Sequence, residues 1–333
     1  MKRALIFSSL GYDSGCALRA RYLCDALKRK GWRAELILPP FRNLPFACES
    51  FLSLPKFAWE ALSHPVDLAV GIKPYPNVWT ALWIAKLRGA QSVVDVDDLD
   101  SSWRGGLLGK LSALIQAPAF YLLNLFSTHH PAIRESLADR GRTLDLGQGV
   151  DSSIFFPRRV KAERRLFYTA HLNVASQLDI LMRWVSPWLE RHSDWRLLIA
   201  GGGPRLSEYR RRFASPQVEF SGILSPEAVA IQMARAKICL SAYDASPGND
   251  FRVPMKIHEY LAMAKPVLSN GISGLQSLKK FLYLCEPGEA AFSKMLQRLS
   301  EGRGDGREKR GAAWMKKNLS WDKVADRFLS ELN

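Results

Sequence analysis

The sequence is poor in cysteine, and its few cysteines have no recognisable arrangement. The five thiols are odd in number and scattered along the chain, and they form neither a C-x-x-C pair nor a metal-ligand spacing with histidine. This pattern excludes a disulfide framework, a thioredoxin-like motif and a zinc finger. We predict reduced thiols, as in the cytoplasm.

Long apolar runs are also missing. After Lys2 and Arg3 comes an apolar run that is too short for a secretory signal and ends at a glycine, so we expect a first β-strand there. The most apolar region, residues 107–126, is interrupted by Lys110 and Pro118, whereas a membrane-spanning helix needs about 20 mainly apolar residues. We expect no spanning helix.

The same apolar region leaves two alternatives open. Trp103, Arg104 and Lys110 flank a run of leucines, a composition that suits a helix lying on a membrane surface. The other alternative is a pair of packed helices beneath a sheet. An anionic membrane surface therefore stays among the expected partners.

Acidic residues are too few to balance the basic ones, and the formal net charge is +15. Residues 1–157 hold 18 Lys and Arg against 14 Asp and Glu, so most of the positive excess lies in the rest of the chain. A positive field favours nucleotides, anionic lipids and nucleic acids alike. Because no basic-and-aromatic motif for base recognition accompanies this charge, we predict no nucleic-acid partner.

What the chain does have is a repeated alternation of short apolar segments and helical patterns, which is typical of parallel sheets wrapped by helices. A length of 333 residues suits two such domains, since single cores rarely exceed about 250–300 residues. The sequence therefore predicts an α/β fold of two doubly wound, Rossmann-like domains. The expected strands are 4–8, 34–38, 68–72, 92–96 and 143–146 in the first half, and 166–169, 196–200, 218–221, 238–241 and 267–268 in the second.

A polar segment separates the two expected domains. The stretch from Gly149 to Pro157 closes the first domain, and charge density then rises through residues 158–165. We predict an N-terminal domain over residues 1–157 and a C-terminal domain over residues 158–318. An amphipathic helix is expected over residues 319–333.

The most informative motif is the segment 252–270, RVPMKIHEYLAMAKPVLSN. Pro254 suits the first turn of a helix, Pro266 ends that helix, and the apolar residues between them recur at helical spacing. Lys256 and Glu259 are three residues apart and share a face near the helix start, where unpaired N–H groups favour a phosphate. The segment suits a diphosphate and a sugar, and the alternative is an ordinary amphipathic helix.

This segment resembles the donor-site helix of retaining GT-B glycosyltransferases, the group 1 or family 4-like enzymes, and the G-V-D and F-x-P motifs within residues 149–157 are similar to the end of their first domain. The resemblance implies two Rossmann-like domains that face a cleft, with a C-terminal helix crossing back onto the first. It also implies that Glu259 is the second glutamate of a pair. Phe251 occupies the position of the first, and Asp250 beside it is the substitute that we expect to bind the donor.

The resemblance further implies how the donor is held. Arg252 and Lys256 would neutralise the departing diphosphate, and Glu259 would hold ribose hydroxyls. Where the family has an arginine and a lysine that clamp the diphosphate, this sequence has His171 and Ser176. We expect His171 to contact the donor.

Glycines follow two of the predicted strands. Gly15 lies in the loop after the first strand, and Gly201 and Gly203 lie in the GGGP turn after strand 196–200. Glycine lets a ligand approach the backbone closely, and the resemblance implies that all three glycines border the donor. For the loop of Gly15, the alternative is a tight strand-to-helix turn.

Carboxylates cluster at the end of strand 92–96. Asp95, Asp97 and Asp98 are costly together unless they bind a cation or sugar hydroxyls. We assign Asp98 to the catalytic site on the acceptor side, with Asp97 beside it. The alternative is a cap for a helix that begins after Ser101.

Together these motifs predict a glycosyltransferase of the hexosyltransferase type that moves a sugar, with retention, from a nucleotide-diphosphate sugar to a glycan or lipid-linked acceptor. The donor is a substrate, so no cofactor is expected, and the resemblance to GT-B enzymes implies that no metal is needed. The expected location is the cytoplasm, with the inner face of the cell membrane as an open alternative. Because three expected donor-site residues are replaced, the competing hypothesis is a catalytically silent GT-B module that binds partners in glycan synthesis.

Overall fold

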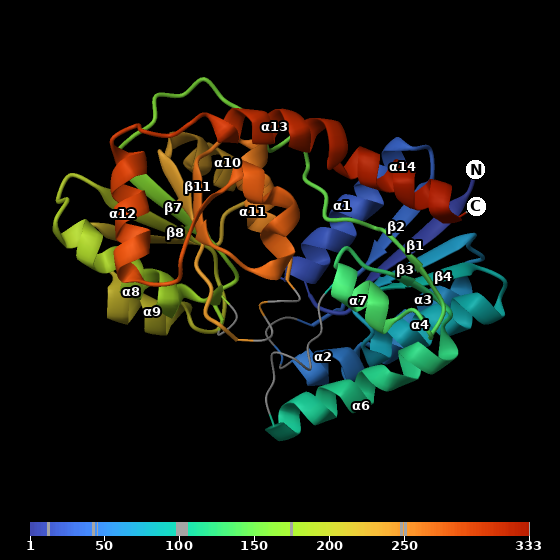
Figure 1. Ribbon diagram of the computed structural model, residues 1–333. Coiled ribbons are helices and arrows are strands. Elements are labelled where there is room, and N and C mark those ends of the chain that lie inside the picture. Colours follow the sequence, from blue (N-terminus) through green and yellow to red (C-terminus); the bar gives the residue numbers. More distant parts are fainter. Residues whose placement is uncertain are drawn as a thin grey trace. The chain divides into compact units, whose positions relative to one another are not determined.

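The computed structural model describes residues 1–11, 14–41, 44, 46–97, 106–173, 176–246, 249 and 252–332. The chain forms two compact units (Figure 1), one of Met1–Gln148 with Trp321–Asn333 and one of Gly149–Ser320. Residues 149–157, which the sequence analysis assigned to the first domain, therefore cluster with the second. The reason is local: the Val150 N–H donates to the Leu319 carbonyl at 2.8 Å, and Phe155 packs in the core of the second unit.

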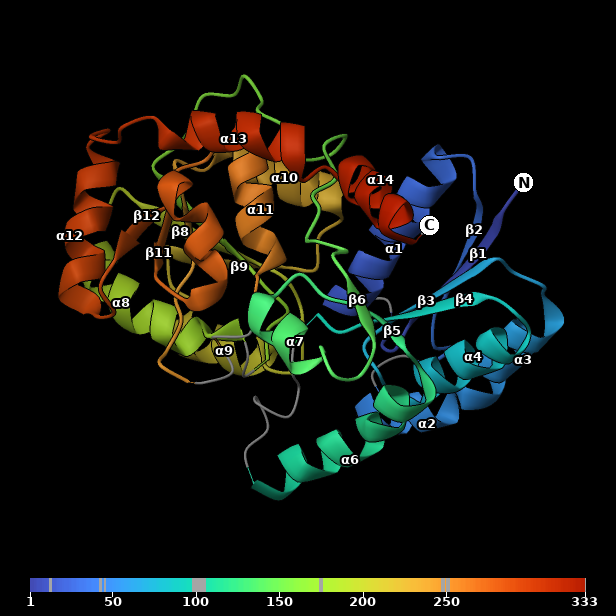
Figure 2. The same cartoon turned by 45° about the vertical axis from the view of Figure 1, so that its right-hand side comes forward.

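The first unit is a parallel sheet of order β2-β1-β3-β4-β5-β6 with helices on both faces (Figure 2). Its central strands are buried on both faces, which requires the nearly continuous apolar runs seen in the sequence. The strands are β1 (Arg3–Ser8), β2 (Arg33–Ile37), β3 (Leu68–Ile72), β4 (Gln91–Asp95), β5 (Leu125–Ser127) and β6 (Arg142–Leu144). The helices are α1 (Gly15–Arg29), α2 (Phe46–Leu52), α3 (Leu54–Ser63), α4 (Pro76–Leu87), α6 (Gly106–Leu122), α7 (Pro131–Ser136) and α14 (Trp321–Leu332).

Helix α14 packs on α1 of the first unit, as the sequence predicted for the C-terminal helix (Figures 1 and 2). The ring centroids of Tyr22 and Trp321 lie 6.0 Å apart, and both rings are buried. At the edge of this contact, Arg29 Nε donates to Asp322 Oδ1 at 2.7 Å. The last helix therefore closes the core of the unit in which the chain begins.

The second unit repeats the architecture with a parallel sheet of order β12-β11-β10-β7-β8-β9. Helices α8, α9 and α12 cover one face of this sheet, and α10, α11 and α13 cover the other. Along β7 the buried side chains alternate between the two faces of the sheet. Leu166 and Tyr168 pack in the core under α8, α9 and α12, and Phe167 packs in the core under α10, α11 and α13. The two parallel sheets confirm the predicted pair of Rossmann-like domains.

The strands of the second unit are β7 (Arg165–Thr169), β8 (Arg196–Ala200), β9 (Val218–Gly222), β10 (Ile238–Leu240), β11 (Val267–Asn270) and β12 (Tyr283–Cys285). The helices are α8 (Leu178–Glu190), α9 (Leu206–Phe213), α10 (Pro226–Arg235), α11 (Met255–Ala262), the 3₁₀ helix η3 (Ser273–Phe281), α12 (Glu289–Ser300) and α13 (Arg307–Asn318).

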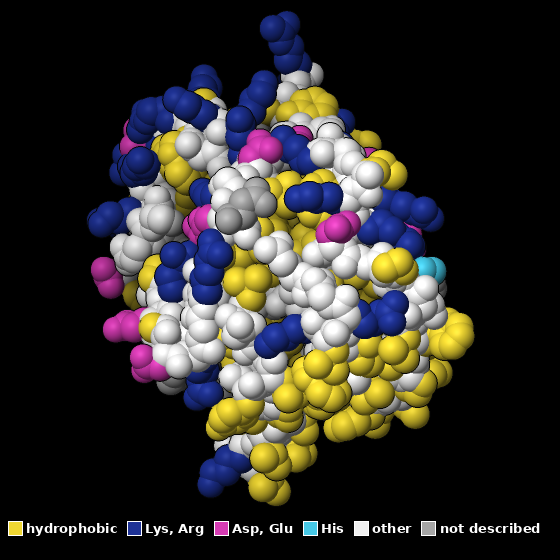
Figure 3. Space-filling model, turned by 90° about the vertical axis from the view of Figure 1, so that its right-hand side faces the viewer, with side chains coloured by type: hydrophobic (Ala, Val, Ile, Leu, Met, Phe, Trp, Pro, Cys, Tyr) yellow, Lys and Arg dark blue, Asp and Glu magenta, His cyan; other side chains and the backbone are white. Residues whose placement is uncertain are grey.

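Within the described residues, the apolar region that left two alternatives open forms one helix, α6, while Trp103 and Arg104 lie outside the described residues. Helix α6 packs beside α4, which in turn packs on α3 and α2. Figure 3 shows apolar side chains gathered over the lower part of the molecule, where these helices lie in Figure 1. In the described part of the chain, no helix is long and apolar enough to cross a membrane.

Both ends of α10 are held by side chains. Ser225 Oγ accepts from the Ala228 N–H at 3.2 Å, and Lys265 Nζ donates to the carbonyls of Ala234 and Ala236 at 2.5 and 2.9 Å. We expect Ser225→Ala to lower the free energy of unfolding of the second unit by about 1 kcal/mol, because the Ala228 N–H loses its acceptor. The urea midpoint of that unit measures this loss. The exposed Ser277→Ala is the control, and equal midpoints for the two variants would contradict the cap.

Candidate functional site

The order of strands in the second unit marks one edge of its sheet as a ligand site. The chain leaves the central strand β7 toward β8 and β9 on one side, then returns to build β10, β11 and β12 on the other. Connections from the carboxyl ends of β7 and β10 therefore diverge, and such a switch point opens a crevice at the end of a parallel sheet. Helix α11, which carries the motif singled out in the sequence, follows β10 at this place.

Helix α11 turns its apolar face inward and its charged residues toward the site. Ile257, Tyr260 and Leu261 are fully buried in one core, as the helical spacing predicted. Lys256 is half-buried, and its Nζ lies 4.0 Å from the ring centroid of Tyr168 on β7. Glu259, one turn further along, is only 8% exposed.

Burial makes the positively charged form of Lys256 less favourable. Removal from water lowers the pKa of its ammonium group well below the ordinary value, the positive charge of Arg252 lowers it further, and Glu259 acts in the opposite direction. Among the described residues, no carboxylate forms an ion pair with Lys256. The faces of aromatic rings attract cations, so Tyr168 supplies part of the missing stabilisation. A ligand anion beside Lys256 would supply the rest.

Burial shifts the pKa of the Glu259 carboxyl group in the opposite direction, and here too it disfavours the charged form. Burial raises its pKa to about 7, although the charge of Lys256 acts to lower it. Among the described residues, none donates a hydrogen bond to this carboxylate. A buried carboxylate without donors is expensive, and hydroxyl groups of a ligand are the donors that would match it.

Arg252 stands just before the helix. Its guanidinium lies 5.8 Å from the ring centroid of Tyr243, and its Nη1 donates to Asn249 Oδ1 at 3.4 Å. Asp250 and Phe251, which the sequence analysis weighed for the sugar-orienting position, lie outside the described residues.

A layer of buried hydrogen bonds fixes these elements, and no local sequence pattern indicates it. The Thr169 N–H at the end of β7 donates to the Tyr260 hydroxyl at 3.0 Å, which ties α11 to the central strand. The amide of Asn270 at the end of β11 bonds both the N–H and the carbonyl of Tyr243 at 2.8 Å. The carboxyl ends of β7, β10 and β11 are thereby held in one arrangement around the start of α11.

The two positions at which the family resemblance led us to look for cations differ from each other. His171 follows β7 and is exposed. Ser176 is buried, its Oγ donates to the Asn173 carbonyl at 2.6 Å, and its own carbonyl accepts from the Tyr168 hydroxyl. Ser176 therefore shapes the loop after β7 and brings no charge to the site.

Gly201 and Gly203 have a reason within the fold for being glycine. Their φ angles are +131° and +140°, which side chains rarely adopt. A Cβ on Gly201 would lie 1.9 Å from the Ala170 carbonyl oxygen, and one on Gly203 would lie 2.6 Å from the Leu172 carbonyl oxygen. The loop after β8 thus packs backbone to backbone on the loop after β7, and donor contact by these glycines stays a prediction.

Gly15, the third predicted glycine, belongs to the first unit. It opens α1, whose N-cap is Ser14, and it is exposed with open space where a Cβ would stand. Among the described residues, none would lie within 4 Å of that Cβ, so none of them requires glycine at this position.

The acidic cluster of the first unit is divided among different roles. Asp95 is buried and accepts two hydrogen bonds from the buried Arg19 guanidinium, at 2.6 and 3.2 Å, and one from Ser127 Oγ. Asp97 lies 3.9 Å from Lys73 Nζ, and Lys73 itself has a φ of +66°. Asp98, the predicted catalytic residue, lies outside the described residues.

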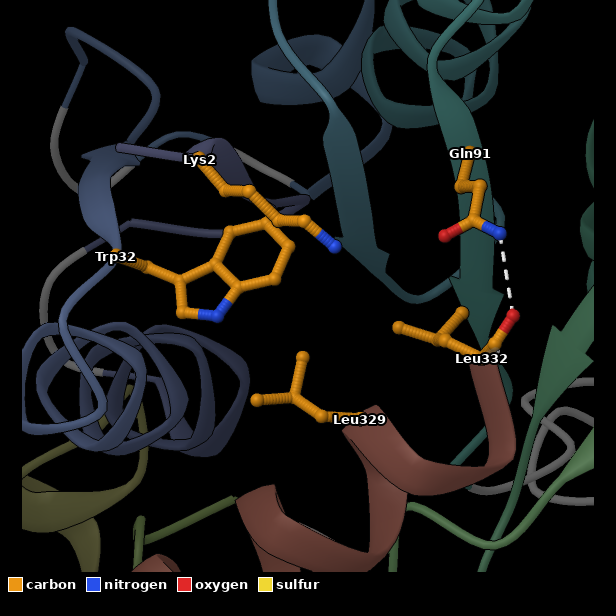
Figure 4. Close-up of a pocket in the computed structure, with 5 residues that line it drawn as sticks. All are labelled: Lys2, Trp32, Gln91, Leu329 and Leu332. Carbon is orange, nitrogen blue, oxygen red and sulfur yellow. Dashed lines mark hydrogen bonds between the residues drawn. The ribbon is translucent and has the colours of Figure 1, made fainter.

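A cavity of about 300 Å³ in the first unit lies at the opposite end of its sheet from this cluster (Figure 4). It is lined by Lys2, Trp32 and Gln91, which stand at the amino ends of β1, β2 and β4, and by Leu329 and Leu332 of α14. Lys2 lies over the Trp32 ring, and Gln91 Nε2 donates to the Leu332 carbonyl at 3.1 Å. Ligand sites of such sheets form at the carboxyl ends, so this cavity is not the candidate site.

Comparison with known proteins agrees with this placement. Residues 163–301 match the family model described as Glycosyl transferases group 1, and this range contains β7 to β12 and α11. Among curated proteins, no sequence matches the chain. The fold, by contrast, is shared with many solved structures.

Three of these structures show the range of proteins with this fold. A sucrose-phosphate synthase from Thermosynechococcus elongatus is 16% identical, with a TM-score of 0.75 over 100% of this chain and 98% of that one. A variant of S. aureus TarM in complex with fondaparinux, alpha-GlcNAc-glycerol and UDP is 14% identical, with a TM-score of 0.65 over 84% of this chain and 59% of that one. A UDP-N-acetylglucosamine 2-epimerase is 10% identical, with a TM-score of 0.62 over 99% and 95%.

These matches establish the GT-B fold for the chain, with a group 1 glycosyltransferase match in its second unit. Because an epimerase has the same fold, the fold alone does not specify the reaction. The chemistry depends on the residues at the switch point.

Proposed function

We propose that this protein is a glycosyltransferase that moves a sugar from a nucleotide-diphosphate sugar to a glycan or lipid-linked acceptor, with retention and without a metal. One observation carries the proposal: within the family-matched range, Lys256 is half-buried and Glu259 is buried on α11 at the switch point, and among the described residues neither has the partner that a diphosphate or a hydroxyl would provide. The family match and the GT-B neighbours support sugar transfer.

Each residue has a definite task in this reaction. The bond between the sugar carbon and the diphosphate oxygen breaks, that carbon bonds to an acceptor hydroxyl oxygen, and the hydroxyl proton passes to the departing diphosphate, on which negative charge accumulates. Lys256, Arg252 and the N–H groups at the start of α11 stabilise that charge, more strongly in the transition state than before it. Glu259 accepts hydrogen bonds from ribose hydroxyls and so positions the donor.

Uridine diphosphate is the first nucleotide to test, because UDP occupies the TarM complex. We expect UDP to raise the melting temperature by a few degrees, since a ligand at tenfold excess over its Kd stabilises the folded state by roughly 1.4 kcal/mol. A thermal-shift series of UDP, GDP, ADP and dTDP measures this, with the matching monophosphates as controls. Equal shifts with monophosphates and diphosphates would contradict a diphosphate site at Lys256.

A second candidate function follows from Ser176 and His171. One position that resembles a diphosphate clamp holds a buried serine with a structural role, and the other holds an exposed histidine. A silent GT-B module would therefore bind nucleotide and transfer nothing. Product analysis with a UDP-sugar and a mixture of acceptors separates the two, and a UDP-sugar altered without any acceptor would indicate an epimerase instead.

We further propose a cytoplasmic location. In the described part of the chain no disulfide joins the cysteines, and three of the thiols are buried, which agrees with a reducing compartment. Nucleotide sugars as donors fit the same compartment.

A further inference from the structure

Helix α6 of the first unit is amphipathic, but its apolar face is exposed and its more polar face is buried. Its inward face carries small and polar residues, and Ser112, Gln116 and Ala119 are all buried. Its outward face carries leucines at positions 107, 111 and 114, with exposures of 81%, 50% and 69%. These positions are four and three residues apart and so form one stripe. A surface helix of a soluble protein normally turns such a stripe toward its own core.

The stripe continues at the end of the helix and onto the neighbouring helices. Tyr121, one more pair of turns along α6, is 80% exposed, and Trp59 on α3 is 69% exposed. Two contacts fix α6 on α4: Trp79 Nε1 donates to the Ile115 carbonyl at 3.2 Å, and Lys86 Nζ donates to the Leu122 carbonyl at 3.0 Å. The other exposed apolar residues of this layer are Phe51 and Leu52 on α2, Leu62 on α3, and Trp83 and Leu87 on α4.

These exposed apolar side chains therefore form one continuous patch and are not scattered singly over the surface. Figure 3 shows it as a broad region of apolar side chains over the lower part of the molecule, with Lys and Arg side chains along its borders. Large exposed apolar patches of this kind mark a site of contact with another protein or with a membrane.

The described charges around this surface are mainly positive. Helices α4 and α6 contain no acidic residue, whereas Lys86 and Lys110 lie on them and Arg88 caps α4. Arg140 lies over the rings of Phe120 and Tyr121 at the end of α6. On α2 and α3, Glu49 is buried and Glu60 is partly buried 3.8 Å from His64, while Lys56 is exposed.

We propose that the outer surface of α2, α3, α4 and α6 docks on an anionic lipid bilayer. The leucine stripe would enter the boundary between headgroups and acyl chains, the tryptophans and Tyr121 would lie at headgroup level, and the basic residues would face the lipid phosphates. A second copy of the chain fits less well, because its identical surface would bring these cations against one another. The proposal goes beyond sugar transfer and can be tested without any donor.

Flotation of the full chain with vesicles tests it. We expect the protein to float with vesicles that contain phosphatidylglycerol and to float less with pure phosphatidylcholine, since each Lys or Arg near an anionic surface strengthens binding roughly fivefold. Added salt should weaken the binding to anionic vesicles, because it screens exposed charges. Wild-type protein that stays at the bottom with both kinds of vesicle would overturn the proposal.

Leu111→Gln with Leu114→Gln is the decisive variant. Both side chains are exposed, so the melting temperature should be unchanged, while vesicle affinity should fall on the order of a hundredfold, or tenfold for each leucine removed from the bilayer. The matched control is Val160→Gln with Ile231→Gln, which replaces two exposed apolar residues of the second unit and should float as the wild type does. Unchanged flotation of the α6 variant would refute the docking surface. So would a wild-type dimer that the α6 variant turns into a monomer, if neither protein floats, because the surface would then cover a second copy.

Discussion

Replacement of Lys256 by alanine is expected to lower kcat/KM for sugar transfer by 10²- to 10³-fold. This is roughly the effect of removing one preorganised charge or donor from a developing anion. Nothing in the free protein forms an ion pair with Lys256 among the described residues, and its pKa is already lowered by burial and by Arg252. Its stabilisation therefore becomes available when a diphosphate arrives. Initial rates with the preferred donor, measured over a range of concentrations, give the two kinetic constants.

The design of this test has to separate charge from packing. Lys256→Met keeps the length of the side chain beside the Tyr168 ring but removes the charge, so it should be as inactive as Lys256→Ala and at least as stable as the wild type. Lys279→Ala is the control, because Lys279 is an exposed cation of the same unit on η3. If Lys256→Met kept full activity, the ammonium group would have no part in the reaction. Loss of activity in Lys279→Ala would point instead to the general positive field.

The fold was largely predictable because its strands are simple. The central strands of both units are short apolar runs between helical patterns, and strand 68–72 was predicted with its observed bounds. The last part of the second unit was not predicted in detail. β12 has only three residues, and η3 is a 3₁₀ helix, so neither gives a periodic signal of useful length. Helix α12 did carry such a signal, since Phe292, Leu296 and Leu299 are buried at helical spacing.

The site was predictable only in part, for a different physical reason. The spacing of Lys256 and Glu259 placed both on one helix, and the structure bears this out. The bonds of Tyr260 to Thr169 and of Asn270 to Tyr243 join residues far apart in sequence, so no local pattern contains them. The same holds for Arg19, whose buried pairing with Asp95 removes that carboxylate from the predicted acidic cluster. Helix α6 was ambiguous because composition does not tell which face of a helix meets the core.

Glu259→Gln is expected to stabilise the protein at alkaline pH and to leave its stability unchanged at acidic pH. Burial raises the pKa of the Glu259 carboxyl group to about 7 in the folded protein, from an ordinary value of 4.5. The folded state therefore holds a proton that the unfolded state releases between these two values. Stability is consequently present in full below the lower pKa, and it is lost as the pH rises through the upper one. Glutamine resembles the protonated carboxyl group and does not titrate, so the variant avoids this loss.

The size of the effect follows from the shift, which is worth at most about 3 kcal/mol of unfolding free energy. Urea unfolding of the second unit at about pH 4 and at about pH 8 should give equal midpoints for the two proteins at the lower pH and a higher midpoint for Glu259→Gln at the upper. The Lys256→Met background sharpens the argument. The charge of Lys256 lowers the pKa of Glu259, so without it the carboxylate is more costly and the gain from Glu259→Gln at alkaline pH should grow. A gain that is equal at both pH values would mean that folding does not shift the pKa of Glu259, and that water or an ion reaches the carboxylate which we expect to bind the hydroxyls of the donor.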